Sequence, residues 1–176
     1  RRMLIAEFRN YVFASVHVGL TASARRGTGP IIKAEAERWV ETGKPLIIAG
    51  DFNDGPDDAA LNFLYQQQLH NVSRNAKGSH GAKGSYKYQG RWESIDHILV
   101  SDALLPHHQE SSVHDAPFLL EEDTKYGGVQ PHRNYVGMRY QKGYSDHLPL
   151  VVKFWGGRGE RNERNERNER NESAKP

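Results

Sequence analysis

A continuous apolar run at residues 45–49 limits the fold of this chain more than any other segment. Such a run is typical of a strand buried on both faces, which requires cover on each side of its sheet. It follows a helical pattern at residues 31–42, in which Ile32 and Ala36 share one face and Gly43 provides a stop. The sequence therefore predicts an α/β domain in which helices flank a mixed β-sheet.

Shorter patterns predict the other elements. Two apolar runs separated by Arg9 and Asn10 favour a β-hairpin, and a second helix is expected to begin at Asp57 or Asp58 and to end at Gln68. The hairpin strands are expected at residues 3–8 and 11–18, loops at residues 21–30 and 71–84, further strands at residues 85–88, 94–101 and 148–154, and a long irregular connection with short helical turns at residues 102–141.

Composition sets the limits of the folded body. Residues 156–176 consist almost entirely of Arg, Asn, Glu, Gly and Ser, with an Arg-Asn-Glu repeat. A repeat without an apolar face cannot dock on a core, so the domain is expected to span residues 1–155 and the tail to be disordered. The net charge of only +2 argues against a protein that coats nucleic acid through bulk charge. The chain has no cysteine, which excludes disulfides, thiolate zinc sites and cysteine nucleophiles.

The compartment stays open at the level of sequence. No run of about 18 apolar residues suggests a membrane span, and no signal peptide is present. The chain begins with Arg1 and Arg2 instead of Met, so we expect its natural N-terminus to be missing. A cysteine-free chain is compatible with the cytoplasm and with export.

Polar residues suited to catalysis lie at the ends of the predicted strands or within one. They are His17, Asp51, Asn53, Asp96, Asp146 and His147. Because ligands bind at strand ends in open α/β sheets, these positions can converge on one rim. Oxygen ligands suit a hard divalent cation, and histidines with an acidic partner, either Asp96 or Asp146, suit proton transfer. The set indicates metal-assisted hydrolysis of phosphoesters.

Each of these residues also has a purely structural interpretation. His17 could be a surface histidine, and the segment at residues 50–56 could be only a turn, because Asp, Asn, Gly and Pro favour turns. Asp96 is harder to explain in this way, since an ionised carboxylate is rarely buried without a partner. His97 alternates with Asp96 and is expected to face the other side of its strand.

Four short segments occur in an order that carries a family resemblance. They are Ser-Val-His-Val at 15–18, Gly-Asp-Phe-Asn at 50–53, Ser-Ile-Asp-His-Ile-Leu-Val-Ser at 94–101 and Ser-Asp-His-Leu-Pro at 145–149. Over residues 1–154 the chain resembles the endonuclease/exonuclease/phosphatase family, which includes pancreatic-type deoxyribonucleases, abasic-site endonucleases, sphingomyelinases and inositol-phosphate phosphatases. The pairing of Gly-Asp-Phe-Asn with a later Ser-Asp-His is the specific part of this resemblance.

The resemblance implies a role for each residue that handles water or phosphate. His147 contacts the scissile phosphate or activates the attacking water, and Asp51 positions that water. Asn53 binds the phosphate or a second metal, and His17 donates a hydrogen bond to a phosphate oxygen. Asp96 orients a histidine.

The resemblance also implies Mg²⁺, with Mn²⁺ as an alternative, near Asp146, Asp51 and Asn53. Family members carry an earlier strand that ends in Gln-Glu, whose Glu is the main magnesium ligand, and Glu7 comes too late in the order to take that role. Their fold is a four-layer α/β/β/α sandwich, of which this chain is expected to supply about half, as a C-terminal portion. We therefore expect the isolated chain to be nearly inactive, unless a separate chain or a lost segment supplies the N-terminal half.

The substrate is the least constrained part of the prediction. Basic and aromatic residues that could grip a phosphodiester are Arg25, Arg26, Tyr88, Arg91, Trp92 and Arg133. We expect a nucleic acid or a small phosphodiester before a lipid, and phosphomonoesters stay open. The alternative is a truncated, non-catalytic remnant that binds nucleic acid or a protein partner through its exposed sheet face.

Overall fold

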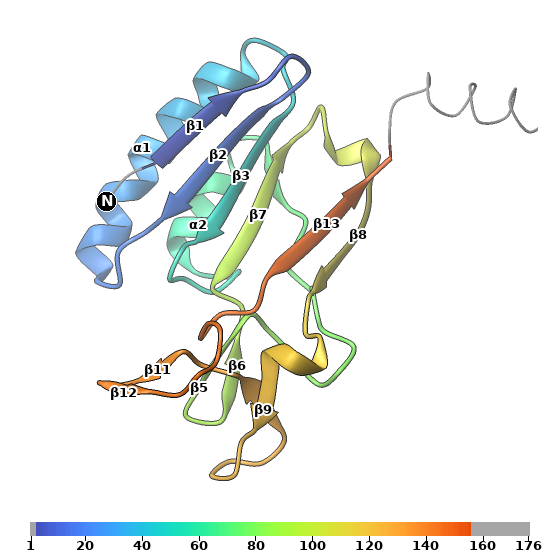
Figure 1. The fold of residues 1–176 in the computed structure, drawn as a ribbon. Coiled ribbons are helices and arrows are strands. Elements are labelled where there is room, and N and C mark those ends of the chain that lie inside the picture. Colours follow the sequence, from blue (N-terminus) through green and yellow to red (C-terminus); the bar gives the residue numbers. More distant parts are fainter. Residues whose placement is uncertain (1–2, 156–176) are drawn as a thin grey trace, which may run out of the picture.

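The structure is a computed structural model that describes residues 3–155, and a five-stranded mixed sheet is its largest element (Figure 1). The strands lie in the order β1 (Met3–Glu7), β2 (Val12–His17), β3 (Leu46–Asp51), β7 (Asp96–Ser101) and β4 (Leu69–Asn71). Strands β2 and β3 are parallel, and the other neighbouring pairs are antiparallel. The predicted hairpin and the predicted buried strand are confirmed.

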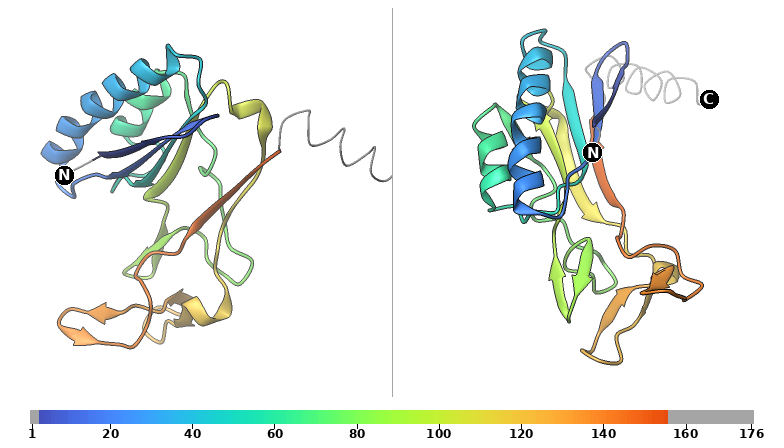
Figure 2. Two further views of the ribbon diagram at one scale, coloured as in Figure 1. Left: turned by 45° about the horizontal axis from the view of Figure 1, so that its top comes forward. Right: turned by 90° about the vertical axis from the view of Figure 1, so that its left-hand side faces the viewer.

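Two helices, α1 (Ala22–Val40) and α2 (Ala59–Tyr65), cover one face of this sheet (Figure 2). Alternate residues of the strands point toward them, and these form one core with the helices. Its buried members include Val12, Ala14, Val16, Leu46, Ile48 and Leu99 from the sheet and Ile32, Ala36, Leu61 and Leu64 from the helices. Each fully buried Leu or Ile stabilises the fold by about 1.5–3 kcal/mol relative to an exposed one.

The prediction of a loop at residues 21–30 is wrong, because α1 begins at Ala22. Gly27, Gly29 and Pro30 disfavour a helix by about 1 kcal/mol for each Gly and about 3 kcal/mol for Pro. Tertiary contacts outweigh this cost. Thr21 caps the helix by accepting a hydrogen bond from the Ala24 N–H at 3.2 Å, and Gly29 is buried facing α2.

The second helix is shorter than the sequence suggests. Asp58 occupies the N-cap position, but its Oδ2 accepts from the Gly55 N–H at 2.7 Å and makes no bond to the helix itself. The helix ends at Tyr65, before the predicted end at Gln68, which has a left-handed φ of 57°.

A pair of antiparallel strands, β8 (His108–Val113) and β13 (Leu150–Phe154), lies on the side of the sheet away from the helices (Figure 2). A second, smaller core supports it, with Ala76, Ala82, Val113 and Leu148 buried. This pair leaves part of the sheet open, since Leu4 on β1 is 74% exposed.

The prediction of an irregular connection at residues 102–141 is wrong where that segment contains β8 and two further hairpins, but the predicted short helical turns are present at Leu105–His107 and Pro117–Leu119. The predicted strand at 85–88 is present as β5 (Tyr86–Tyr88), and it pairs with a strand that was not predicted, β6 (Arg91–Glu93). The remaining elements are η1 (Leu105–His107), η2 (Pro117–Leu119), β9 (Leu120–Glu122), β10 (Val129–Pro131), β11 (Tyr135–Val136) and β12 (Arg139–Tyr140). Strands of two or three residues are too short to show an alternating pattern in the sequence.

Two buried carboxylates hold these short elements in place. Asp123 forms an ion pair with Lys87 of β5 at 2.7 Å, with both side chains only 4% exposed. Asp115 accepts hydrogen bonds from the backbone N–H groups of Ser79, His80 and Ala82, at 2.7–3.1 Å. These polar anchors act together with the second core, against which Leu119 and Leu120 pack.

The predicted tail at residues 156–176 lies outside the residues that the structure describes. Within residues 3–155, no helix combines the length and the apolar character that crossing a membrane requires.

Candidate active site

Three of the predicted residues lie in one row across neighbouring strands. His17 at the end of β2 pairs in register with Asp51 at the end of β3, and Asp51 pairs with Asp96 at the start of β7. Gly50 makes this close packing possible, because a Cβ atom there would lie 1.8 Å from the Val16 carbonyl oxygen. Its φ of 150° also favours glycine.

The turn after β3 is built by Asp51 and Asn53. Asn53 has a left-handed φ of 52°, which Asn tolerates better than most residues. Its backbone N–H donates to Asp51 Oδ1 at 2.8 Å, and its Nδ2 donates to Asp51 Oδ2 at 3.1 Å and to the Val18 carbonyl at 2.8 Å. Because an amide nitrogen carries two hydrogens, both are engaged, and the amide oxygen is the group with which Asn53 can act on a ligand.

Asp51 is partly buried at the floor of the site. Burial raises the pKa of its carboxyl above the usual value, against the opposing effect of the hydrogen bond from the Asn53 backbone, and the nearby charge of Asp96 also raises it. The exposed imidazole of His17 lies close by, with Nε2 3.5 Å from Asp51 Oδ2. A carboxyl with a raised pKa is suited to accept a proton.

His147 is held by Asp96. Its Nδ1 lies 2.7 Å from Asp96 Oδ2, which also accepts from the Ser85 hydroxyl at 2.6 Å. The hydrogen bond to Asp96 raises the pKa of the His147 imidazole, against the effect of desolvation. The ring also packs against Tyr86, with centroids 4.9 Å apart. This is the geometry that the predicted orienting role of Asp96 requires.

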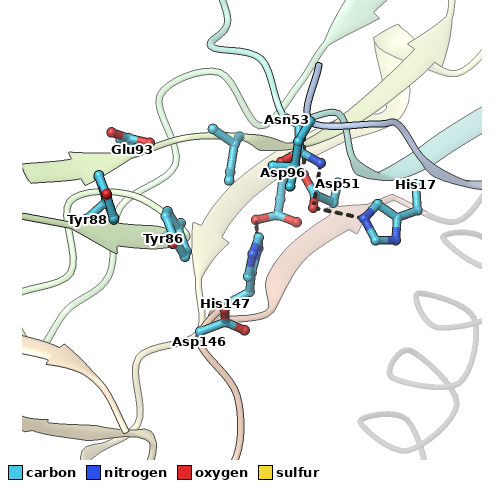
Figure 3. Close-up of a pocket in the computed structure, with 11 residues that line it drawn as sticks. His17, Asp51, Asn53, Tyr86, Tyr88, Glu93, Asp96, Asp146 and His147 are labelled. Atoms are coloured by element: carbon cyan, nitrogen blue, oxygen red, sulfur yellow. Dashed lines mark hydrogen bonds and ion pairs between the residues drawn. The ribbon is translucent and has the colours of Figure 1, made fainter. Parts of the chain in front are cut away.

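A cleft of about 790 Å³ joins these groups (Figure 3). All six predicted residues line it, although they come from four distant parts of the sequence. The lining consists of His17, Leu20, Asp51, Asn53, Tyr86, Tyr88, Glu93, Ile95, Asp96, Asp146 and His147. Asp146 is exposed, and Figure 3 places it beside His147 on the side away from Asp51.

Sequence reasoning missed Ser85 and Glu93, and it did not predict that Tyr86 packs against His147. Ser85 directly precedes a recognisable strand, but its contact with Asp96 depends on how β5 and β6 fold back beside β7. The antiparallel bridge between Tyr86 and His147 is likewise a long-range pairing. No periodicity in the sequence reports such a pairing.

The structure separates the predicted substrate-binding residues. Tyr88 lines the cleft, and Arg133 lies behind it, with its guanidinium 5.1 Å from the Tyr86 ring centroid. Trp92 packs against the second core, so it is a structural residue in this fold, and Arg91 is exposed on β6.

The remaining two, Arg25 and Arg26, line a different pocket of about 450 Å³ between α1 and α2. Arg25 is engaged there in an ion pair with Asp54 at 2.7 Å. These six residues therefore do not form one surface.

The oxygen donors of the cleft suit Mg²⁺ in type but do not form a closed set. Asp51, Asn53 and Asp146 all line the cleft. Among residues 3–155, however, no group of three or more His, Cys, Asp or Glu side chains is placed to share a metal ion. Mg²⁺ commonly keeps several waters and binds through one or two carboxylates plus substrate phosphates, so this donor set is compatible with it. The metal stays a prediction.

Comparison with solved structures identifies the fold. Similar structures include a mannosyl-6-phosphatase from Bacteroides thetaiotaomicron (TM-score 0.57, 18% identity, 83% of this chain and 51% of that chain). Others are a 3′ phosphatase from Neisseria bound to a product DNA hairpin (0.54, 17%, 89% and 65%) and an AP endonuclease from Archaeoglobus fulgidus (0.56, 14%, 87% and 65%). The chain spans about half the length of the first structures that it matches.

These structural likenesses confirm the predicted fold class, a mixed sheet with helices that corresponds to about half of the α/β/β/α sandwich. A search of curated proteins gives no match to the sequence. The family model described as Endonuclease/Exonuclease/phosphatase family matches residues 25–155, which include Asp51, Asp96 and His147. The chain therefore belongs to the endonuclease/exonuclease/phosphatase family.

Proposed function

We propose that this cleft hydrolyses phosphoester bonds, with a phosphodiester of a nucleic acid or a small phosphodiester as the preferred substrate. One observation carries the proposal. His17, Asp51 and Asp96 form a row across three strands, and Asp96 holds His147 beside that row within one cleft. The arrangement provides proton-transfer groups and hydrogen-bond donors around a space large enough for a phosphate group.

His147 handles the proton of a phosphoryl oxygen or of the attacking water. Its Nδ1 is directed at Asp96, so Nε2 is the nitrogen left for a substrate. Because its pKa is raised, the imidazolium form persists to higher pH than for a free histidine. In that form it can donate a proton or stabilise the negative charge that develops on the phosphoryl group.

Asp51 and His17 act at the other side of the same space. Asp51 orients a water molecule and accepts its proton. His17 is exposed and close to Asp51, so its ring can donate a hydrogen bond to a phosphate oxygen.

A divalent cation, Mg²⁺ or Mn²⁺, is part of the proposal. Asp51, the amide oxygen of Asn53 and Asp146 would hold it, together with waters and the substrate. When bound, such a cation neutralises charge on the phosphate and lowers the pKa of a bound water. Because no three His, Cys, Asp or Glu side chains among the described residues are placed to share a metal ion, we expect the chain alone to bind Mg²⁺ weakly and to turn over slowly.

The choice of substrate rests on the rim of the cleft. Tyr88 is 53% exposed and lines the cleft, which provides a ring on which a base can stack. Arg133 lies close behind and adds positive charge. Two of the similar structures are a DNA-bound 3′ phosphatase and an AP endonuclease, which supports the same class of substrate.

The test is hydrolysis by the purified chain of bis(p-nitrophenyl) phosphate, p-nitrophenyl phosphate and a 3′-phosphorylated oligonucleotide, each with Mg²⁺ or with EDTA. We expect slow turnover that needs the metal and that falls by about 100-fold or more in Asp51→Asn, as for the loss of a general base. Turnover unaffected by both EDTA and Asp51→Asn would overturn the proposal.

The alternative, a non-catalytic remnant, makes a different prediction. It is favoured because no three His, Cys, Asp or Glu side chains among the described residues are placed to share a metal ion. No turnover with any substrate, together with oligonucleotide binding that weakens steeply with salt, would support it.

A further inference from the structure

We infer that Arg25 and Asp54 form a clamp that positions the catalytic turn, instead of contacting substrate. The inference rests on the proposed function, since the turn that the clamp holds carries Asp51 and Asn53. Arg25 belongs to the first turns of α1, and Asp54 directly follows Asn53. Neither is among the residues that line the cleft.

Arg25 connects two loops. Its Nε lies 2.7 Å from Asp54 Oδ1, and its Nη1 donates to the carbonyl oxygen of Leu20. Leu20 lies between β2 and α1, three residues after His17, and itself lines the cleft. One guanidinium therefore ties the loop that follows His17 to the loop that follows Asp51. The planar guanidinium makes these two contacts through separate nitrogens held in a fixed geometry, which a single Lys ammonium nitrogen does not reproduce.

Asp54 is also held from the opposite side. The buried ring of His97 donates from Nε2 to the Asp54 carbonyl oxygen at 2.9 Å, and its Nδ1 accepts from Asn71 Nδ2 at 3.0 Å. These partners fix which ring nitrogen carries the hydrogen. Burial lowers the pKa of His97, so the ring stays neutral. Backbone and side chain of Asp54 are thus both anchored.

The loop that follows His17 and the loop that follows Asp51 also bond directly to each other. The Val18 N–H donates to the Asp51 carbonyl at 2.8 Å, and the Asn53 amide donates to the Val18 carbonyl at 2.8 Å. These bonds place the Asp51 carboxylate beside His17. The clamp lies outside the cleft lining and adds a side-chain connection between the same two loops.

The Asp54 side chain is only 8% exposed and that of Arg25 26% exposed. In a charge pair that is mostly withdrawn from water, removal of one partner is costly because it leaves the other charge buried and unpaired. Loss of either residue should therefore release the turn.

The first arm of the test measures amide hydrogen exchange and needs no catalytic activity. In Arg25→Met, hydrogen exchange at the backbone N–H groups of Asn53 and Val18 should accelerate by about tenfold or more. The backbone N–H of Ile48, in the middle of β3, should keep its wild-type exchange rate. Arg38→Met, the same change at the far end of α1, is the matched control and should alter neither amide. Unchanged Asn53 and Val18 exchange in Arg25→Met would overturn the clamp.

The second arm separates positioning from substrate binding in the enzyme assay. Arg25→Met and Asp54→Asn should each lower kcat by up to about 100-fold with little change in KM, because a displaced catalytic group slows the chemical step. The double variant should be no worse than the more impaired single variant. Arg25→Lys keeps the charge but not the fork, so it should not restore kcat. A raised KM with an unchanged kcat in Arg25→Met would instead make Arg25 a substrate contact, and additive losses would show that Arg25 and Asp54 act independently; either result overturns the clamp.

The two arms distinguish failure of the clamp from failure of the proposed function. If wild type shows no turnover but Arg25→Met releases the Asn53 amide, the clamp holds and the hydrolase proposal fails. If turnover is normal in Arg25→Met and Asp54→Asn, the clamp fails and the proposed function stands.

Discussion

Gly50→Ala should destabilise the protein strongly, because Gly50 lies where β3 and β2 come closest, one residue before Asp51. An added Cβ would lie 1.8 Å from the Val16 carbonyl oxygen and 2.8 Å from the Val16 carbonyl carbon. Real Cβ atoms do not approach backbone so closely, so one strand must move by more than 1 Å. The residue also has a φ of 150°, which a side chain strains.

The two effects give the size of the loss. Forcing extra volume into a packed region costs about 1–3 kcal/mol. Holding a non-glycine residue in a conformation that glycine favours costs about 1–3 kcal/mol more. We therefore expect the free energy of unfolding to fall by about 2–6 kcal/mol, a large part of the 5–15 kcal/mol typical of a domain.

Urea unfolding followed by tryptophan fluorescence measures this change. Gly27→Ala is the matched control, because Gly27 lies within α1 and a Cβ there meets nothing within 4 Å. It should stabilise the protein by about 0.5–1 kcal/mol, since Ala favours a helix more than Gly does. A Gly50→Ala variant within about 0.5 kcal/mol of wild type, which is the range of an ordinary surface substitution, would refute the reasoning.

Two further predictions concern charged pairs. Asp96→Asn should lower the pKa of His147 toward 6.5, which NMR titration measures. In wild type, the raised pKa of His147 stabilises the fold below pH 6.5, and this stability is lost as the pH rises through the raised pKa. The variant should lack this contribution to stability. An unchanged His147 titration would contradict the pairing. Lys87→Met should lower Tm more than Lys153→Met, because the ion pair of Lys153 is exposed. Lys87→Met should also raise the pH of acid unfolding. Lys87 holds the pKa of Asp123 below 3.8, and the stability that this lowered pKa contributes is lost as the pH falls. Equal Tm losses in the two lysine variants would show that burial of the pair is unimportant.

The row formed by His17, Asp51 and Asp96 could be predicted from the sequence because its members lie in or next to recognisable strands. Asp51 follows a strand whose apolar run is unmistakable, and His17 ends a strand of the same sheet. Parallel pairing of those strands places both residues at one edge. Asp96 stood out because a carboxylate in an apolar strand needs a partner, and the structure gives it Ser85 and His147.

The parts that could not be predicted depend on contacts between distant segments. Gly29 and Pro30 argue against a helix locally, and tertiary packing of α1 on the sheet and on α2 outweighs this. Arg25 could be recognised as a basic residue near a site, but its partner Asp54 is fixed by the tertiary fold. The hairpin of β9 and β10 is connected to β5 by the buried Lys87–Asp123 pair, and no periodic pattern in the sequence indicates that pair.

Turnover by wild type compared with His147→Ala tests the central claim most directly. The assay is hydrolysis of the best phosphodiester substrate in Mg²⁺, with His107→Ala, an exposed histidine outside the cleft, as the control. If the cleft is the active site, His147→Ala lowers kcat by about 100-fold or more, as for loss of a general acid or base, and His107→Ala matches wild type. Equal turnover in all three proteins would contradict the account, because hydrolysis would then take place away from the Asp96–His147 pair.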